Sequence, residues 1–289
     1  MSRPLHPPDG DRVAAIVRAA LDEDAARVDA TVAYVEFGER VIDADIRVSV
    51  DTVVSGMEVA RAVFHEFDPA CAFDALAADG DVVAAGRSLC RLRGRAASIV
   101  SSERTALNFL QRLCGIATHA ARFVRAVEGT GVVILDTRKT TPLWRELEKY
   151  AVRCGGAQNH RRDLQAMILI KDNHVRAMGG RDELLRRLAR GDRPAFVEVE
   201  VDSLDFLRAL LGAPVDRIML DNFTPSTVAD ALSLVRAHRA AHPGRLEIEV
   251  SGGITLDNVR AYAQPGVDFI SVGALTHSAP AASMSLEVP

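Results

Sequence analysis

The pattern of hydrophobic and polar positions changes along this chain, and the change divides it near residue 131. Before that point, apolar residues from Val13 to Leu21 recur with the spacing of a helix that buries one face. Residues 41–50 alternate apolar and polar side chains, which predicts a strand with one buried face, and residues 31–37 predict a second strand. We expect these elements to form a one-sided sheet with the helix packed on it.

The first part continues with a mixture of helices and strands that do not alternate strictly. Residues 57–67 predict a helix, and residues 82–95 predict further strands interrupted by glycines. A long helical pattern then runs from Ser101 to about Val127 and ends in a glycine-rich stretch. We interpret this helix as the joint between two domains.

After residue 131 the chain repeats a short apolar run, a polar or glycine-containing turn and a helical stretch. This repetition predicts parallel strands joined by crossover helices, with helix starts at Thr224 and Thr255. The runs predict a parallel barrel, complete or incomplete, with an open doubly wound sheet as the alternative. The six runs are residues 132–136, 167–171, 196–201, 217–221, 246–251 and 268–273.

Composition narrows the class of protein. The 289 residues are 48% hydrophobic, 26% charged and 5% aromatic, which is typical of a soluble globular protein. A net charge of −4 provides no general positive field for nucleic acid or an anionic membrane, so we expect neither as a partner. The four cysteines lack zinc spacing, and we find no signal sequence and no apolar run of about 18 residues. We therefore expect a cytoplasmic protein.

The predicted strand ends carry the chemistry. In a parallel barrel these ends meet at one mouth, where catalytic residues gather. Arginine and lysine there suit anions, and carboxylates opposite them suit a divalent metal or a developing cation. We expect a barrel enzyme acting on an anionic, phosphorylated substrate, with an aldolase as the rival reading. The strand ends are Asp136 to Lys139, Lys171 to His174, Glu198 with Glu200, Asp221 with Asn222, Ser251 to Gly253, and Gly273 with Ala274.

Several of these positions have more than one interpretation. Ser251-Gly252-Gly253 before a helix suits a phosphate, although a turn needs glycine for structural reasons too. His160 can be a general acid or base, a metal ligand or a capping residue, and its neighbour Arg161 favours an anion-binding loop. Glu198 and Glu200 share one face of a strand, and we favour Glu200 as the functional one because it is closer to the mouth. We interpret Trp144 and all four cysteines as structural.

An ordered set of motifs resembles the quinolinate phosphoribosyltransferase family. The stretch ERTALNFLQRLCGIAT (103–118) resembles the helix that precedes the barrel in that family. The resemblance covers roughly residues 100–289, and the first hundred residues match in architecture more than in motif. The other motifs are DTRKTTP (136–142), LEKYAVRCGG (147–156), NHR (159–161), LIKDNHV (169–175), LDN (220–222), EVSGGI (249–254) and SVGALTHSAP (271–280).

The resemblance implies a fold and an activity. The fold is α/β: an N-terminal open α/β sandwich at residues 1–115, joined by the C-terminal segment 276–289, and an incomplete parallel α/β barrel at residues 116–275. The activity is transfer of phosphoribose from phosphoribosyl pyrophosphate to quinolinate with decarboxylation, which gives nicotinate mononucleotide, pyrophosphate and CO2 in NAD biosynthesis, with Mg²⁺. A homodimer with shared active sites, or a hexamer, is also implied.

The resemblance also assigns roles to residues. Lys139, Glu200 and Asp221 are implied as catalytic residues, and Glu200 and Asp221 also as the metal ligands. The implied quinolinate-binding residues are Arg104, donated across the dimer interface, Thr137, Arg138, His160, Arg161 and Lys171. The implied phosphoribosyl pyrophosphate-binding residues are Lys139, Glu200, Asp221, Ser251, Gly252, Gly253, Gly273, Ala274 and His277.

The chain departs from the family pattern at a few positions near the quinolinate motifs. Leu143 stands where the family usually has glycine and is followed by Trp144, Ala157 replaces a third glycine, and Asp163 occupies a small position. These changes leave open a paralogue that uses a different pyridine or dicarboxylate acceptor. A third possibility, a non-catalytic ligand-binding relative, would be expected to lose Glu200 and Asp221, and both are present.

Overall fold

The computed structural model describes residues 5, 7–191, 195–242 and 246–289. These residues form two compact units. The N-terminal unit comprises the described residues up to Ala121 together with Thr140–Gly156 and Leu275–Pro289, and the barrel unit comprises Arg122–Lys139 and Ala157–Ala274. The sequence-based boundaries place residues 116–121, 140–156 and 275 in the barrel, whereas this division groups them with the N-terminal unit.

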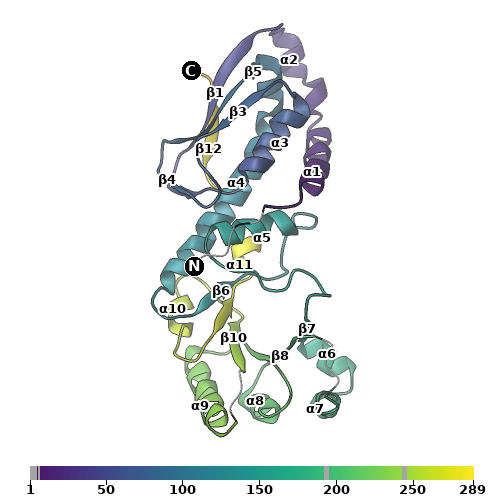
Figure 1. Cartoon of the computed structure of the whole chain (residues 1–289), viewed down its shortest axis with the longest axis vertical. Coiled ribbons are helices and arrows are strands. Elements are labelled where there is room, and N and C mark those ends of the chain that lie inside the picture. Colours follow the sequence, from purple (N-terminus) through teal and green to yellow (C-terminus); the bar gives the residue numbers. More distant parts are fainter. Residues whose placement is uncertain (1–4, 6, 192–194, 243–245) are drawn as a thin grey trace. The chain divides into compact units, whose positions relative to one another are not determined.

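The N-terminal unit is built on a four-stranded antiparallel sheet, in the order β12-β1-β5-β3. The last strand of the chain completes this sheet, because β12 pairs with β1 in the register Ile46↔Leu286 (Figure 1). The elements are α1 (Gly10–Glu23), η1 (Ala26–Val28), α2 (Ala30–Val35), β1 (Val41–Val48), β2 (Thr52–Val53), α3 (Met57–Phe67), β3 (Ala72–Ala75), β4 (Val82–Val83), β5 (Ser88–Arg95), α4 (Ala96–Ala126), α5 (Arg145–Cys154), α11 (Ala274–His277) and β12 (Met284–Glu287).

The prediction of a strand at residues 31–37 is wrong. The segment forms helix α2, because the side chain of Asp29 accepts hydrogen bonds from the backbone N–H groups of Thr31 at 2.8 Å and Val32 at 3.0 Å. None of the helix residues is buried, and Tyr34 is 90% exposed. The β-branched and aromatic residues there have no sheet to pack on, so the local N-cap decides the conformation.

A buried ion pair connects segment 140–156 to the N-terminal unit. Glu148 of α5 is fully buried and accepts hydrogen bonds from Arg112 of α4 at 2.9 Å and from the Thr141 hydroxyl at 2.8 Å. The guanidinium of Arg112 also donates to the backbone carbonyls of Thr276 and Ala279. A buried carboxylate is stable only with such partners, so α5 packs against the part of α4 that carries Arg112.

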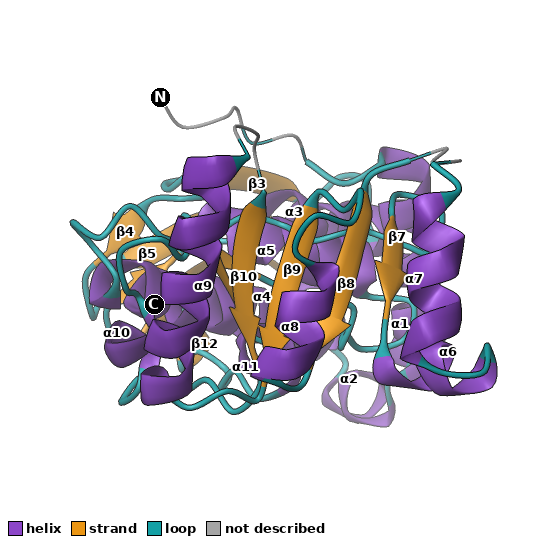
Figure 2. Ribbon diagram, turned by 90° about the horizontal axis from the view of Figure 1, so that it is seen from below, coloured by secondary structure: helices purple, strands orange, loops and turns teal. Residues whose placement is uncertain are grey.

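The barrel unit contains all six predicted strands. They form one parallel sheet in the order β6-β11-β10-β9-β8-β7. Helices α8 and α9 lie on one face of strands β7–β10 (Figure 2). The elements are β6 (Val133–Leu135), β7 (Ile168–Ile170), α6 (Asp172–Ala177), α7 (Arg181–Ala189), β8 (Val197–Val201), α8 (Leu204–Leu210), β9 (Arg217–Asp221), α9 (Pro225–Ala241), β10 (Glu247–Ser251), α10 (Val259–Tyr262) and β11 (Phe269–Ser271).

The strand order identifies the sheet as an incomplete barrel. From β7 to β11 the strands follow one another in chain order, and β6 lies next to β11. A doubly wound sheet reverses its order in the middle, which this sheet does not do. Strands β6 and β7 do not pair within the described residues, so the barrel is open between them. The predicted fold class is confirmed.

Of the two predicted helix starts in this unit, one is confirmed and one is displaced. Helix α9 begins at Pro225, and the Thr224 hydroxyl caps it by accepting from the N–H of Thr227. Helix α10 begins only at Val259, because the N–H of Thr255 donates to the side chain of Asn258 and residues 256–258 form a turn. Across the described ranges, no helix combines the length and apolar character needed to span a membrane.

Candidate active site

A cavity of about 560 Å³ opens at the carboxyl ends of the barrel strands. Eleven of the residues assigned to the site from sequence line it: Thr137, Arg138, Lys139, His160, Arg161, Lys171, Glu200, Asp221, Ser251, Gly252 and Gly253. Five residues that were not assigned line it as well: Leu169, Met219, Asn222, Glu249 and Ser271.

Four assigned residues do not line this cavity. Arg104 and His277 belong to the N-terminal unit and are exposed, and the ring Nδ1 of His277 lies 2.6 Å from the Ser278 hydroxyl. Gly273 and Ala274 follow β11 and are half-buried, with Ala274 as the first residue of α11. The structure describes a single chain, so it places Arg104 only within its own unit.

The cationic side of the cavity brings two arginines close together. Burial lowers the pKa of Arg161, and the neighbouring charge of Arg138 lowers it further, while Glu198 opposes both effects. Two guanidinium groups that repel each other in this way favour an anion between them. The side chain of Lys171, at the end of β7, donates to Glu200 at 2.9 Å.

The acidic side consists of Glu200 at the end of β8 and Asp221 at the end of β9. Burial raises the pKa of Asp221, and the charge of Glu200 raises it further, whereas Lys171, Asn222 and Lys139 lower it. The two carboxylates are therefore close enough to repel each other. Any cation that bound between them would relieve this repulsion.

The turn after β10 requires glycine. Gly252 has φ of +94°, and a Cβ at this position would lie 2.8 Å from the backbone nitrogen of Asn222 and would also collide with the Asn222 side chain. The N–H of Asn222 donates to the carbonyl of Ser251 at 2.9 Å, which holds the turns after β9 and β10 together. Without Cβ atoms at Gly252 and Gly253, backbone N–H groups can approach a phosphate closely.

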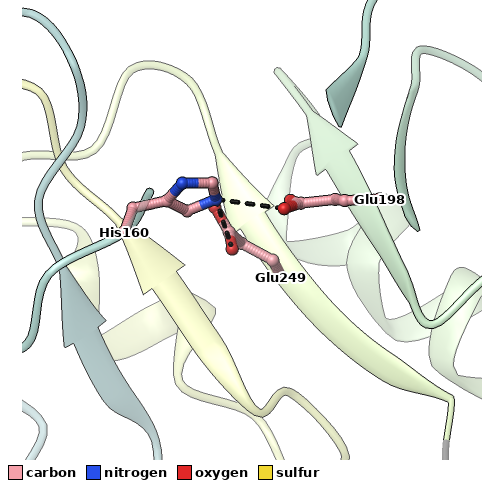
Figure 3. A group of neighbouring side chains, drawn as sticks. All are labelled: His160, Glu198 and Glu249. Atoms are coloured by element: carbon pink, nitrogen blue, oxygen red, sulfur yellow. Dashed lines mark hydrogen bonds and ion pairs between the residues drawn. The ribbon is translucent and has the colours of Figure 1, made fainter. Parts of the chain in front are cut away.

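His160 lines the cavity, and its ring nitrogen faces two buried carboxylates, Glu198 and Glu249 (Figure 3). Its Nε2 lies 3.0 Å from Glu198 and 3.5 Å from Glu249, and neither glutamate is exposed. Burial lowers the pKa of His160, but the hydrogen bonds to the two glutamates outweigh it and raise the pKa to about 9. The backbone N–H of Arg161, 2.7 Å from Nδ1, favours the neutral ring instead. In both forms Nε2 carries a proton.

The glutamates themselves are balanced by Arg217 at the start of β9. The guanidinium donates to Glu249 at 2.8 Å and lies 3.9 Å from Glu198. Burial and the charge of Glu249 raise the pKa of Glu198. The pKa of Glu249 is lowered, because the interactions with His160 and Arg217 outweigh the effect of its burial. His160 and the two glutamates are metal-binding residue types, and their ligand atoms lie within 4.8 Å of one another. Because His160 bonds to both glutamates and Arg217 neutralises their charge, they fit a charge network better than a metal site.

The loop that carries His160 is held in place by Asp136. This fully buried carboxylate, directly after β6, accepts from the Asn159 amide at 2.7 Å and from the His160 backbone N–H at 2.8 Å. Asp136 therefore connects the DTRKTTP motif (136–142) with the NHR motif (159–161). From the sequence Asp136 is one of the strand-end residues, and only the tertiary structure shows that it holds this loop.

Sequence reasoning missed Glu249 and Arg217, although a signal was available. Glu249 precedes Ser251 by two residues in β10, and Arg217 precedes Asp221 by four in β9, so each pair shares one face of its strand. The register Glu198↔Arg217↔Glu247 then brings these charges side by side across three strands. Reading the whole inward face, rather than the strand ends alone, would have found them.

Comparison with known proteins gives the family. The model described as "Quinolinate phosphoribosyl transferase, N-terminal domain" matches residues 29–114, and that described as "Quinolinate phosphoribosyl transferase, C-terminal domain" matches residues 116–287. The chain belongs to the quinolinate phosphoribosyltransferase family.

Relatives in this family cover nearly the whole chain. A probable nicotinate-nucleotide pyrophosphorylase [carboxylating] of Bacillus subtilis is 38% identical over 87% of this chain and 85% of its own. The corresponding enzyme of Mycobacterium leprae is 40% identical over 78% of this chain and 79% of its own. The solved nicotinate-nucleotide pyrophosphorylase of Francisella tularensis superposes with a TM-score of 0.89 at 36% identity, covering 100% of both chains.

The departures from the quinolinate phosphoribosyltransferase pattern do not line the cavity. Trp144 stacks on Phe109 with ring centroids 4.6 Å apart, and Leu143 takes up φ of +67°, a conformation that suits the usual glycine. Ala157 is buried, and the side chain of Asp163 accepts from the backbone N–H groups two and three residues further on. Trp144 is a packing residue, as predicted.

Proposed function

We propose that this chain transfers phosphoribose from phosphoribosyl pyrophosphate to quinolinate, with loss of one carboxyl group as CO2, to give nicotinate mononucleotide and pyrophosphate. The observation that carries the proposal is the cavity itself. In a chain that belongs to this family, it gathers Arg138, Arg161 and Lys171 opposite Glu200 and Asp221. A dicarboxylate and a pyrophosphorylated sugar need these two kinds of surface together.

The cations account for acceptor binding. Quinolinate carries two adjacent carboxylates, and Arg138 and Arg161 can each bind a carboxylate through two parallel hydrogen bonds. Lys171 adds a compact charge, and Thr137 adds a hydroxyl at the same wall of the cavity. Clustering cations before the substrate binds lowers the cost of burying its charges.

The acidic side of the cavity and the neighbouring glycine turn account for binding of the donor, phosphoribosyl pyrophosphate. The Ser251–Gly253 turn offers backbone N–H groups to phosphate oxygens, and Lys139, whose charge acts on Asp221, is a further cation in the cavity. As pyrophosphate leaves, positive charge grows on the ribosyl ring, and Glu200 and Asp221 stabilise it. Gly273, Ala274 and His277 keep their assignment to phosphoribosyl pyrophosphate as a proposal from the family resemblance.

Decarboxylation needs little from the protein beyond this. Once the pyridine nitrogen carries the ribosyl group it is cationic, and the electron pair left when CO2 departs is stabilised next to it. No side chain is required to form a covalent bond with the substrate. Holding the acceptor in place and neutralising its remaining carboxylate are the tasks of Arg138, Arg161 and Lys171.

Glu200 and Asp221 also fit Mg²⁺. They are hard oxygen donors on neighbouring strands that line one cavity, and their mutual repulsion favours a cation between them. When bound, Mg²⁺ supplies positive charge that neutralises the pyrophosphate oxygens. The two carboxylates would be its protein ligands.

We also propose that the chain works as a homodimer in which Arg104 completes the site of the partner subunit. The exposed position of Arg104 on α4 supports this, because its side chain is accessible to a second subunit. The hexamer remains an alternative assembly. We propose a cytoplasmic location, which the four unpaired, buried cysteines support.

The decisive experiment incubates purified protein with quinolinate, phosphoribosyl pyrophosphate and Mg²⁺ and follows nicotinate mononucleotide by mass spectrometry. Nicotinate and other pyridine dicarboxylates are tested in parallel. We expect product from quinolinate alone. Product only from another acceptor would replace quinolinate with a different substrate while keeping the donor site, and no product from any acceptor would favour a ligand-binding relative.

A further inference from the structure

Both ring nitrogens of His160 are used by the protein. Nε2 is 3.0 Å from Glu198 and 3.5 Å from Glu249, and Nδ1 accepts from the N–H of Arg161 at 2.7 Å. A histidine that accepts a proton from a substrate needs a free ring nitrogen within hydrogen-bond reach. His160 lines the cavity but does not offer one.

The carboxylates that hold His160 are part of a charge ladder across three strands. We define the ladder as Glu247, Arg217, Glu249, Glu198 and His160. Arg217 donates to Glu247 at 2.8 Å and to Glu249 at 2.8 Å, and His160 closes the ladder at the cavity end. Every one of these side chains is at most 12% exposed. Inward-facing barrel positions are ordinarily filled by branched apolar residues, so a buried charged layer here needs an explanation.

The ladder ends at the loop that carries Arg161, and the start of this loop is already paired with β6 through the backbone of Gln158. Residues 157–167 lead from this bridge to β7 and include Arg161. Asp136 fixes the backbone at His160, and the ladder fixes the ring of His160. The ring in turn accepts from the N–H of Arg161, so the ladder reaches the acceptor-binding arginine through one side chain.

We propose that Glu198, Glu249 and Arg217 are positioning residues that fix the ring of His160 and, through it, Arg161 in the geometry that binds the acceptor dicarboxylate. The ring of His160 is then held in one orientation, with its Nε2 proton directed at the glutamates, and His160 is not the general base of the reaction. The benefit is preorganisation, because an arginine held in its binding geometry loses less freedom when the acceptor binds. This inference rests on the proposed function for the identity of the acceptor.

Glu198 provides the cleanest test because its carboxylate contacts Nε2 of His160 but does not line the cavity. Its charge also acts on Arg161, so Glu198→Gln, which loses the same charge but keeps a hydrogen-bond acceptor, separates the two effects. In Glu198→Met the acceptor for Nε2 is lost at nearly constant size. We expect the Kd of quinolinate, measured by calorimetry, to rise about tenfold, the scale of one lost buried hydrogen bond. The Kd of phosphoribosyl pyrophosphate with Mg²⁺ should stay within about twofold. Glu198→Gln keeps an acceptor and should retain most of the quinolinate affinity.

Glu247→Gln is the matched control. It weakens the outer end of the ladder at Arg217 but removes no contact with His160. We expect it to lower thermal stability without changing the Kd of quinolinate. Unchanged quinolinate affinity in folded Glu198→Met, or equal weakening of both ligands, would overturn the proposal in favour of a purely structural ladder.

A second measurement needs no substrate. The ¹⁵N shifts of the histidine rings in the wild-type protein, with His160 assigned by comparison with His160→Gln, report which ring nitrogen carries the proton. We expect Nε2 to be protonated and Nδ1 to be unprotonated, the only form in which Nδ1 can accept from the N–H of Arg161. A ring protonated at both nitrogens would break the link to Arg161 and overturn the proposal. A ring protonated only at Nδ1 would overturn the ladder even if quinolinate binds, whereas a protonated Nε2 in a protein that does not bind quinolinate would leave the ladder intact and remove the proposed function.

Discussion

At the scale of single residues, an ion pair between Lys171 and Glu200 connects the cationic and acidic sides of the cavity. Their ion pair at 2.9 Å links a group proposed to bind quinolinate with a group proposed to bind phosphoribosyl pyrophosphate. Each partner must change its bonding when its own substrate binds. The two substrates should therefore favour each other's binding, since either one releases the residue that the other needs.

This coupling predicts an unusual gain of affinity. Glu200→Gln removes the charge that holds Lys171, so quinolinate, measured by calorimetry without phosphoribosyl pyrophosphate, should bind about two- to fivefold more tightly, the range expected for a partly exposed ion pair. Asp221→Asn is the control, because it removes one negative charge from the same cavity without a direct bond to Lys171. Equal gains in the two variants would attribute the effect to the general field and contradict the coupling.

The glycine turn gives a second prediction at this scale. Gly252→Ala must both strain a backbone at φ of +94° and displace Asn222, whereas Gly253, at φ of +62°, has open space around its missing Cβ. We expect Gly253→Ala to cost about 1 kcal/mol of unfolding free energy and Gly252→Ala clearly more, with loss of phosphoribosyl pyrophosphate binding. Chemical denaturation and calorimetry measure both. Equal costs would mean that the approach to Asn222 is not what requires glycine.

Between elements, a single carboxylate joins the end of α3 to the junction of β5 and α4. Asp68 caps α3 and accepts from the Ser98 hydroxyl at 2.6 Å and from Arg95 at 3.0 Å. The hydrogen bond from Ser98 lowers the pKa of Asp68, burial opposes it, and Arg95 lowers it further. This carboxylate is therefore more stable as an anion in the folded protein than in the unfolded chain.

The sign of the pH dependence follows from the lowered pKa. The contribution of Asp68 is present above the unfolded pKa of 3.8 and is lost as the pH falls through the lower folded value. At pH 7, Asp68→Asn should reduce the unfolding free energy by about 1–3 kcal/mol, and the difference should shrink on acidification below pH 4. Asp43→Asn, which breaks an exposed pair with Arg93, should cost less than about 1 kcal/mol. Equal costs for the two variants would contradict this account.

The elements that were predicted well are those whose burial is periodic. The six barrel strands alternate with helices, so an apolar run of four to six residues between turns has only one reasonable assignment. Residues 31–37 have the same composition but no buried face, and the capping bonds of Asp29 made them helical. The grouping of residues 140–156 with the N-terminal unit depends on the buried pair of Arg112 and Glu148, 36 positions apart, which no local pattern can show.

At the scale of the whole molecule, the proposed dimer predicts complementation. Arg104→Ala and Lys139→Ala should each lose most turnover while folding normally, as judged by circular dichroism. If Arg104 serves the partner's cavity, mixing the two variants should restore activity to about a quarter of wild type, because half of the randomly formed dimers are mixed and one of their two sites is intact. Activity in the mixture no higher than the average of the separate variants would contradict shared sites.

The sequence by itself determined the α/β class, the six barrel strands, the family and most of the cavity lining. It could do so because strand periodicity and strand-end residues are local, and because parallel strands bring their carboxyl ends to one mouth whatever the details of packing. Only the tertiary structure decided that Glu200 pairs with Lys171 and that Glu198, Glu249 and Arg217 surround His160. These contacts join strands that are distant in the chain, and their register arises from the packing of the whole sheet.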